Sequence, residues 1–230
     1  SNLGSILLDL GKSKEAERSA RKAIKLNPNL AMSYLNLGTI LKDQRKLKEA
    51  KISQQKAIEL KPDLAEAHYN LGNILIDLGK LKEAEKSLRK AIELKPDYAD
   101  AYFNLSFIDL LQGNYQSGLE NYEFRFKKKN PTTPHAKSKL CRADKDNSQK
   151  SEKLLVISEQ GLGDTLQYMR YIPYLRNQGF DISFCAQSNL HSLIKSSGID
   201  LNPLTPEQAS QVLDGQWIPL LSVPKYLKVR

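Results

Sequence analysis

The chain has 230 residues, of which 40% are hydrophobic and 27% are charged, a balance typical of a soluble globular protein. No apolar run approaches the roughly 18 residues that a membrane-spanning helix needs, and the first residues lack the pattern of a secretory signal, so we expect a cytoplasmic protein with no membrane span. The net charge of +9 is spread along the chain, and most lysines alternate with glutamates at helical spacing, so we expect no nucleic acid partner.

A 34-residue repeat occupies the first part of the chain. Asn2, Asn36 and Asn70 each begin the tripeptide Asn-Leu-Gly, and Asn104 begins Asn-Leu-Ser. Within a unit, two stretches with apolar residues at helical spacing flank a short turn. Small residues let the two helices approach each other, and proline ends the second helix. The other residues that recur at this spacing are Ala16, Ala50, Ala84 and Gly118; Ala23, Ala57 and Ala91; and Pro28, Pro62 and Pro96.

The repeat length and these Leu-Gly, Ala and Pro positions resemble the tetratricopeptide repeat family. The resemblance covers residues 1–130, about four repeats, and the first is incomplete, so we expect part of a repeat upstream. The fourth unit departs from the pattern at Gly118, Tyr122 and Arg125, as a terminal repeat next to another domain would. The cationic run from Arg125 to Lys129 suits an anionic surface, but a helix end also favours cations.

The four recurring asparagines allow two interpretations. The resemblance places the first helix of each repeat on a concave, peptide-binding wall, with Asn2, Asn36, Asn70 and Asn104 turned into the groove. A side-chain amide has both donors and an acceptor, so a ladder of amides could hold the backbone of an extended peptide, as in the O-linked N-acetylglucosamine transferases that this array resembles. Alternatively, the asparagines satisfy polar groups of neighbouring repeats. Both roles can hold at once.

The second part of the chain has a different pattern. Residues 131–152 lose all periodicity and gather Pro, Thr, Ser, Asn and Lys, which predicts a linker. Strand and helix patterns then alternate, which indicates a parallel Rossmann-like sheet with βαβ connections. We expect strands at 153–158, 181–186 and 199–204 and helices at 164–179 and 188–198. The predicted fold class is therefore α plus α/β, with a tetratricopeptide helical-repeat array at 1–130, a linker at 131–152 and a partial Rossmann-like domain at 153–230.

The two cysteines and the glycine turn at 161–163 exclude several kinds of site. Cys141 and Cys185 are too few for a disulfide framework or a zinc site, so we expect reduced thiols, no metal and no cofactor. Leu166 stands where the dinucleotide fingerprint requires Gly or Ala, and Ala186 ends the second strand without an acidic ribose-binding residue. The turn also lacks the Gly-Lys-Ser/Thr of an ATPase phosphate loop.

The segment from Ser158 to Asp200 resembles the start of the catalytic region in bacterial proteins that join tetratricopeptide repeats to a two-domain (GT-B) glycosyltransferase related to the heptosyltransferases. The resemblance implies that Asp164 is the general base that deprotonates the acceptor hydroxyl. It also implies that Gly161 and Gly163 let substrate approach the backbone, and that three neighbouring side chains orient substrate. These three are Gln160, Gln167 and Arg170.

Each part of this interpretation has an alternative. An aspartate just before a helix is a common N-cap, so Asp164 could stabilise the helix without taking part in chemistry. The 78 residues from 153 to 230 are too few for a doubly wound sheet, and the resemblance places the nucleotide-sugar donor site in a second domain. We therefore expect an inactive fragment of a glycosyltransferase whose repeats bind a protein or peptide, with nucleotide sugar bound only by the full-length parent. The alternative is a non-enzymatic interaction scaffold with a vestigial Rossmann-like tail.

Overall fold

The computed structural model describes residues 13–143, 153–159 and 161–228, so Asn2 and Gln160 lie outside the described residues. The chain divides into two compact units, Ser1–Gly113 and Asn114–Arg230. We call them the repeat unit and the sheet unit. The sheet unit begins before residue 130, where the sequence pattern placed the end of the repeat array, because the last helix of the fourth repeat packs with the sheet.

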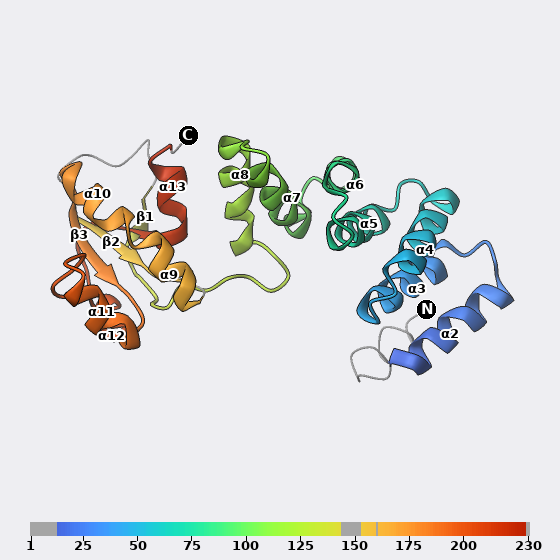
Figure 1. Ribbon diagram of the computed structural model, residues 1–230, viewed down its shortest axis with the longest axis horizontal. Helices are drawn as coiled ribbons and strands as arrows, with labels where there is room; N and C mark the ends of the chain where they lie inside the picture. Colours follow the sequence, from blue (N-terminus) through green and yellow to red (C-terminus); the bar gives the residue numbers. More distant parts are fainter. Residues whose placement is uncertain (1–12, 144–152, 160, 229–230) are drawn as a thin grey trace. The chain divides into compact units, whose positions relative to one another are not determined.

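The repeat unit consists of paired antiparallel helices (Figure 1). The described first helices of this unit carry the recurring asparagine, and its second helices carry the Lys/Glu pattern. Extended backbone at Lys61 and Lys95 ends two of the second helices just before a proline, as the steric effect of proline on the preceding residue requires. The described helices are α2 (Ser13–Leu26), α3 (Ala31–Asp43), α4 (Leu47–Leu60), α5 (Ala65–Asp77), α6 (Leu81–Leu94) and α7 (Ala99–Leu111).

Small residues set the spacing between the two helices of a repeat. Ala50 and Ala84 are fully buried where the paired helices meet. A Cβ added at Gly72 would lie 2.8 Å from Leu88 Cγ, and one at Gly38 would lie 2.4 Å from Gln54 Nε2. The recurring Leu-Gly therefore has a packing cause, because a side chain at these positions would displace the Leu88 or Gln54 side chain that lies against the glycine.

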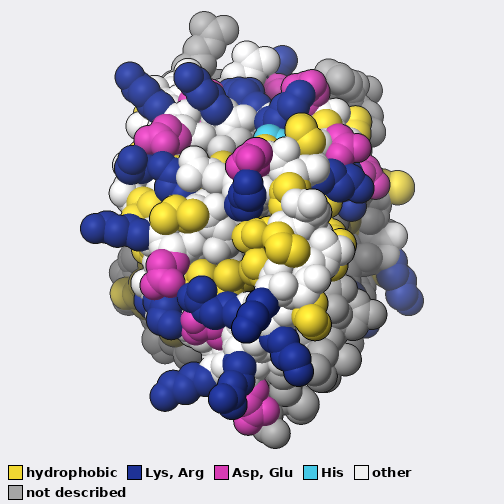
Figure 2. All heavy atoms as spheres, turned by 90° about the vertical axis from the view of Figure 1, so that its right-hand side faces the viewer, with side chains coloured by type: hydrophobic (Ala, Val, Ile, Leu, Met, Phe, Trp, Pro, Cys, Tyr) yellow, Lys and Arg dark blue, Asp and Glu magenta, His cyan; other side chains and the backbone are white. Residues whose placement is uncertain are grey.

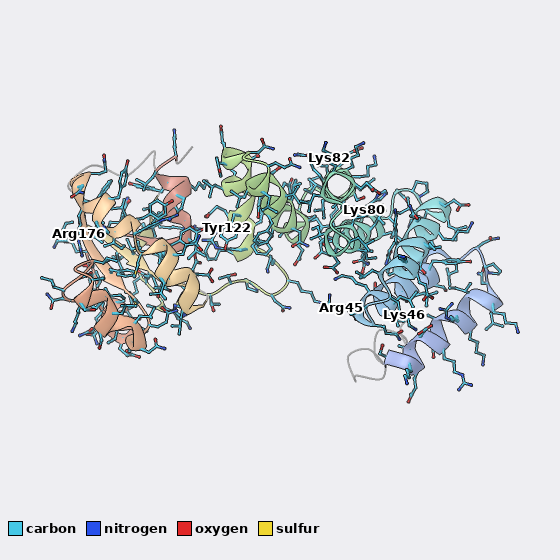
Figure 3. All side chains as sticks on the ribbon, in the orientation of Figure 1. Arg45, Lys46, Lys80, Lys82, Tyr122 and Arg176 are labelled. Atoms are coloured by element: carbon cyan, nitrogen blue, oxygen red, sulfur yellow. The ribbon has the colours of Figure 1, made fainter. Side chains whose placement is uncertain are left out.

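Ion pairs cover the outside of the repeat unit, as the mixed Lys/Glu pattern predicts. Lys46 Nζ lies 2.9 Å from Glu17 Oε2 and Lys51 Nζ lies 3.5 Å from Glu83 Oε2, so these pairs join neighbouring repeats. Lys46 and Lys80 occupy corresponding turns between the two helices of their repeats (Figure 3). Figure 2 shows cationic and acidic side chains interspersed on one face of the molecule. Such exposed pairs contribute about 0–1 kcal/mol each.

The sheet unit contains a small four-stranded sheet in the order β1-β4-β2-β3, with all neighbours parallel. Its strands are β1 (Cys141–Arg142), β2 (Lys153–Ile157), β3 (Asp181–Cys185) and β4 (Gln216–Pro219). Helices lie on both sides of it (Figure 1). The other elements are α8 (Tyr115–Tyr122), η1 (Glu123–Phe126), α9 (Leu162–Tyr168), α10 (Tyr171–Asn177), η2 (Ser188–Leu190), α11 (His191–Ser196), α12 (Pro206–Ala209), η3 (Leu220–Ser222) and α13 (Val223–Tyr226).

The alternation of side chains along β2 gives the sheet two apolar layers. Leu154 and Val156 face the larger layer, which includes Ile172, Phe184 and Ile194. Leu155 and Ile157 face a smaller layer with Ala136, Cys185 and Ala209, and the half-buried Trp217 packs against it. A strand with both faces covered is typical of a parallel sheet, and this accounts for the uninterrupted apolar run in β2.

Three predicted elements of this unit differ from the structure. The expected helix at 164–179 is split into α9 and α10, because Pro173 has no N–H and its ring opposes the carbonyl of Met169. Residues 199–204 are not a strand; Leu204 forms only an isolated bridge with Cys185, and the strand that pairs with the other side of β2 is β4. The predicted linker supplies β1 and the bridge between Pro134 and Glu159, so part of it belongs to the sheet.

Within the described ranges, no helix combines the length and apolar character needed to cross a bilayer. The described elements form a helical repeat array and a small parallel sheet. That this sheet belongs to a partial Rossmann-like domain stays a prediction.

Candidate functional site

The recurring asparagines lie on the first helices of successive repeats and connect them. Asn70 Nδ2 on α5 donates to Thr39 Oγ1 on α3 at 3.2 Å. One repeat later, Asn104 Nδ2 on α7 donates to Asn73 Oδ1 on α5 at 2.6 Å. In both contacts the acceptor stands three residues after the asparagine position of the preceding repeat. We call Asn36, Thr39, Asn70, Asn73 and Asn104 the asparagine face.

These contacts give Asn70 and Asn104 the structural role that is one of the two interpretations. Asn36, Asn70 and Asn104 are all half-buried, so the amides are held in place and still reach the surface. Thr39 Oγ1 in turn donates to Leu35 O, 3.1 Å away, which fixes the hydroxyl that receives Asn70. Sequence reasoning missed Thr39 and Asn73, although their 34-residue spacing could have identified them. Peptide binding by this face stays a prediction.

Aromatic side chains lie next to the asparagine face. The ring centroids of Tyr69 and Tyr98 are 4.8 Å apart, and those of Phe103 and Phe107 are 4.9 Å apart in an edge-to-face arrangement. Tyr69 Oη lies 3.4 Å from Asn104 Nδ2. Burial raises the pKa of Tyr69 despite its hydrogen bonds to amides, so its hydroxyl stays protonated at neutral pH. The face therefore combines amide groups with aromatic surface.

The second predicted site lies at the carboxyl end of β2. Helix α9 begins at Leu162, two residues earlier than expected, and its N-cap is Gly161. Asp164 is therefore inside the first turn and is not the N-cap. Its Oδ2 accepts a hydrogen bond from Gly161 N–H at 3.3 Å, the return contact of a capping box. The half-buried carboxylate of Asp164 thus stabilises the helix start, and its catalytic role is untested.

The other predicted residues of this turn are on the surface. Gly161, Gly163, Gln167 and Arg170 are exposed, and the Arg170 guanidinium lies 5.4 Å from the centroid of the Tyr171 ring. In the part of the chain that the structure describes, no hydrogen bond joins Gln167 or Arg170 to Asp164. The described ranges also contain no group of three His, Cys, Asp or Glu side chains that could hold a metal ion. Among the described residues, Gly161 and Asp164 are the predicted members that a hydrogen bond brings together.

A buried ionic network beside this turn was not predicted. Arg125, on η1, has no exposed side-chain surface, and its Nη2 lies 2.7 Å from Glu159 Oε1, whose side chain is equally buried. Arg125 Nη1 lies 2.9 Å from Glu123 Oε1, and Nη2 donates to Ser222 Oγ at 2.7 Å. Arg125 is thus not available to an external anionic surface, contrary to one interpretation of the cationic run. It binds η1 to the ends of β2 and β4.

Aromatic rings and a second arginine complete this network. The Arg125 guanidinium lies 4.5 Å from the Tyr122 ring centroid and 4.1 Å from that of Phe126. Tyr122, at the end of α8, also packs against the larger apolar layer of the sheet (Figure 3). Burial acts to raise the pKa of Glu123, but the charges of Arg125 and Arg142 outweigh it and hold that pKa below its usual value. The Tyr-Glu-Phe-Arg-Phe segment is therefore an integral part of the sheet unit.

The two cysteines of the chain lie in different environments. Cys141 is exposed and Cys185 is buried, and both are free thiols. Burial raises the pKa of Cys185 to about 12, so this thiol is protonated and unreactive at neutral pH.

Arg176 on α10 donates to Ile199 O and lies 2.9 Å from Asp200 Oδ2, which anchors the segment after α11 (Figure 3).

Comparisons with known proteins identify the repeats. Models of the tetratricopeptide repeat match residues 1–30, 31–64 and 65–98. A crystal structure of MamA is 30% identical, with 55% of this chain and 74% of MamA covered and a TM-score of 0.49. YrrB, described as a tetratricopeptide repeat protein with an unusual peptide-binding site, is 23% identical over 56% of this chain and 66% of YrrB (TM-score 0.48). The first such domain of Spaghetti (RPAP3), bound to an HSP90 peptide, is 23% identical over 49% and 89% (TM-score 0.47). No curated protein matches the chain.

Proposed function

The chain belongs to the tetratricopeptide repeat proteins through residues 1–98, and from this premise we propose that its repeat unit binds an extended peptide segment of a partner protein on the asparagine face. The observation that carries the proposal is the periodic row of half-buried amides on α3, α5 and α7. Amides that repeat at a constant spacing suit a ligand whose hydrogen-bonding groups also repeat. An extended backbone is such a ligand, because it presents N–H and C=O groups at regular intervals.

The contacts between repeats support this function because they orient the amides before a ligand arrives. Asn70 and Asn104 donate toward the preceding repeat, which fixes the rotamer of each side chain. A fixed side chain loses little conformational entropy on binding, so more of each hydrogen bond contributes to affinity. The structural and the binding interpretations of the asparagines are thus compatible.

The experiment is a triple substitution, Asn36→Ala, Asn70→Ala and Asn104→Ala, measured by fluorescence anisotropy against a pool of randomised 12-residue peptides. Each lost hydrogen bond contributes about 1 kcal/mol, so we expect at least tenfold weaker binding. Because the same amides connect repeats, circular dichroism must show that the variant is still folded at the assay temperature. Ser87→Ala on the outer helix α6 is the control. Unchanged peptide affinity in the folded triple variant would refute the proposal.

A second candidate function is glycosyl transfer by a longer protein that contains this chain. The observation in its favour is at the glycine turn. Gly161 has ordinary extended backbone, and among the described atoms a Cβ at Gly163 would meet nothing within 4 Å. The fold itself does not require glycine at these two positions, which fits a turn kept open for a ligand. Asp164 would take the proton of an acceptor hydroxyl as its oxygen attacks the anomeric carbon and the nucleotide leaves.

The substitution Asp164→Asn tests this second candidate in the full-length protein. Asparagine keeps an oxygen for the Gly161 N–H but cannot accept the proton, so turnover should fall about a hundredfold or more with little change in melting temperature. Asp164→Ala should lower both. If Asn at this position keeps wild-type turnover, Asp164 serves only to stabilise α9. A full-length protein without sugar transfer would leave the non-enzymatic scaffold as the function.

A further inference from the structure

The repeat unit separates its charges between the first and second helices of the repeats. The second helices α2, α4 and α6 together carry 12 Lys and Arg against 7 Asp and Glu, a net charge of +5. The first helices α3, α5 and α7 carry the opposite sign, with one cation, Lys42, against five carboxylates, a net charge of −4. These carboxylates are Asp43, Glu66, Asp77, Asp100 and Asp109.

Most of this negative charge lies on the surface near the asparagine face. Asp109 is buried and paired with Arg89 at 3.4 Å, so it contributes little to the external field. Asp43, Glu66 and Asp77 are exposed and Asp100 is half-buried. With Lys42, these four leave a net charge of −3 on the first helices of a chain whose overall charge is +9. Burial raises the pKa of Tyr98, and the nearby carboxylates of Glu66 and Asp100 raise it further, in the direction that a negative field produces.

The same helices carry exposed apolar surface. Phe107 is 45% exposed and Leu111, one turn later on α7, is 74% exposed. Phe107 stands at the position that Asn73 occupies in the preceding repeat, three residues after the recurring asparagine. The asparagine face therefore changes from polar at Thr39 and Asn73 to apolar at the α7 end.

From this combination we infer that the asparagine face selects an extended peptide segment that carries lysine or arginine together with an aliphatic or aromatic side chain. The inference rests on the proposed function and specifies its partner. The amides hold the backbone, the carboxylates of Glu66 and Asp77 attract the cations, and Phe107 and Leu111 receive the apolar side chain. The negative first helices repel acidic segments. An acidic partner would instead suit the positive second helices, which do not carry the asparagine face.

The test uses three peptide pools of 12 residues, identical in their randomised apolar and polar positions, with four further positions fixed as Lys, Gln or Glu. Binding to the full chain is measured by fluorescence anisotropy at low and at about 0.3 M salt, where exposed charges are largely screened. We expect the Lys pool to bind at least tenfold more tightly than the Glu pool, with the Gln pool between them. The difference should shrink at the higher salt concentration.

Two pairs of variants locate the effect on the molecule. Glu66→Gln with Asp77→Asn removes two charges from α5, and Glu59→Gln with Glu93→Gln removes two from the second helices α4 and α6. Only the first pair should reduce the preference for the Lys pool. Phe107→Ser should lower affinity for all three pools, whereas Ile52→Ser, which changes a 66% exposed apolar residue of α4, should not.

The outcomes separate this inference from the function on which it rests. A tighter Glu pool, or a Lys preference that persists in the Glu66 and Asp77 variant, would overturn the charge selection and leave peptide binding intact. Equal binding of all three pools would do the same. If none of the pools binds to the wild-type chain, the proposed function fails, and the inference fails with it.

Discussion

Two arginines, one in each unit, each lie between two glutamates, but the first is about half exposed and the second is buried. Arg21 lies between Glu17 and Glu49, at 2.8 and 3.2 Å, and its side chain is 51% exposed. Arg125 lies between Glu159 and Glu123, at 2.7 and 2.9 Å, and its side chain is fully buried. Because water screens the first group and not the second, similar distances correspond to very different free energies. The repeat unit is held by its apolar and small residues, whereas the sheet unit depends on a buried pair that must stay complete.

The largest predicted effect is that of Arg125→Met on the sheet unit. Removing the guanidinium leaves the Glu159 carboxylate buried without its partner, which costs about 3–5 kcal/mol. Trp217 is the only tryptophan of the chain and lies in β4, so its fluorescence during urea denaturation reports on this unit. Arg21→Met is the matched control and should change stability by no more than about 1 kcal/mol.

A double variant examines the same pair further. Arg125→Met combined with Glu159→Leu removes both charges and should recover most of the lost stability, because the burial of an unpaired charge is the main cost. Equal losses in Arg125→Met and in the double variant would show that the arginine stabilises the unit through its contacts with Tyr122 and Phe126 instead.

The next effect concerns the close packing of helices in the repeat unit. Gly72→Ala places a methyl group 2.8 Å from Leu88 Cγ, in a layer where Leu88 is fully buried. Overpacking costs about 1–3 kcal/mol, and the better helix propensity of alanine offsets up to about 1 kcal/mol of it. We expect a lower thermal midpoint of the far-ultraviolet circular dichroism signal. Combining Gly72→Ala with Leu88→Ala should cost less than the sum of the single changes, and strict additivity would argue against a clash.

Gln54→Leu should stabilise the repeat unit by about 1 kcal/mol, because it removes a buried polar atom. Gln54 Oε1 is buried without a hydrogen bond partner among the described residues, and Leu88 fills the corresponding position in the next repeat. The gain should appear as a higher urea midpoint of the helical signal. Gln55→Leu, on the exposed side of the same helix, is the control. A loss of stability in Gln54→Leu would mean that the 3.0 Å bond from Nε2 to Leu35 O outweighs the buried oxygen.

The smallest effect is the acid sensitivity of the exposed ion pairs. Hydrogen bonds from Lys46 and then Arg21 lower the pKa of Glu17 from 4.5 to about 2, against a small opposing effect of burial. A carboxylate whose pKa is lower in the folded state stabilises above its unfolded pKa, and this stability is lost as the pH falls from 4.5 toward 2. Because the partner side chains of Arg21 and Lys46 are 51% and 43% exposed, solvent weakens these ion pairs, and we expect at most about 1 kcal/mol. The difference between wild type and Glu17→Gln should therefore narrow between pH 6 and pH 3 in urea denaturation.

The repeat unit could be predicted from sequence in nearly every respect because its structure is local. The 34-residue spacing identifies the repeats and gives each helix pair, and Gly38, Gly72 and the prolines mark contacts and ends within a few turns of chain. The contact from Asn104 to Asn73 spans one repeat, so it was also accessible to the spacing argument. The opposite net charges of the first and second helices can also be counted from the sequence, but they are assigned to separate surfaces only once the helix pairs are known.

The sheet unit was harder to predict because its decisive contacts join distant segments. The strands at 153–157 and 181–185 agree with the apolar patterns, but β1 has two residues and β4 has four, and such short strands carry almost no periodic signal. Arg125 was read with its cationic neighbours, since nothing local indicates that Glu159 and Ser222, 34 and 97 residues later, bury it. Asp164 was placed before its helix because Leu162 and Gly163 are not typical first residues of a helix.

The strand order β1-β4-β2-β3 has a consequence for how the chain folds during synthesis. β4 follows the other three described strands in the sequence, yet it lies between β1 and β2 and pairs with both. The repeats form local contacts and can fold as they leave the ribosome, whereas the sheet cannot close until residues 216–219 have emerged. Until then Arg125 also lacks Ser222. Nascent chains arrested before β4 should therefore resist proteolysis in the repeats and be cleaved readily between residues 114 and 215.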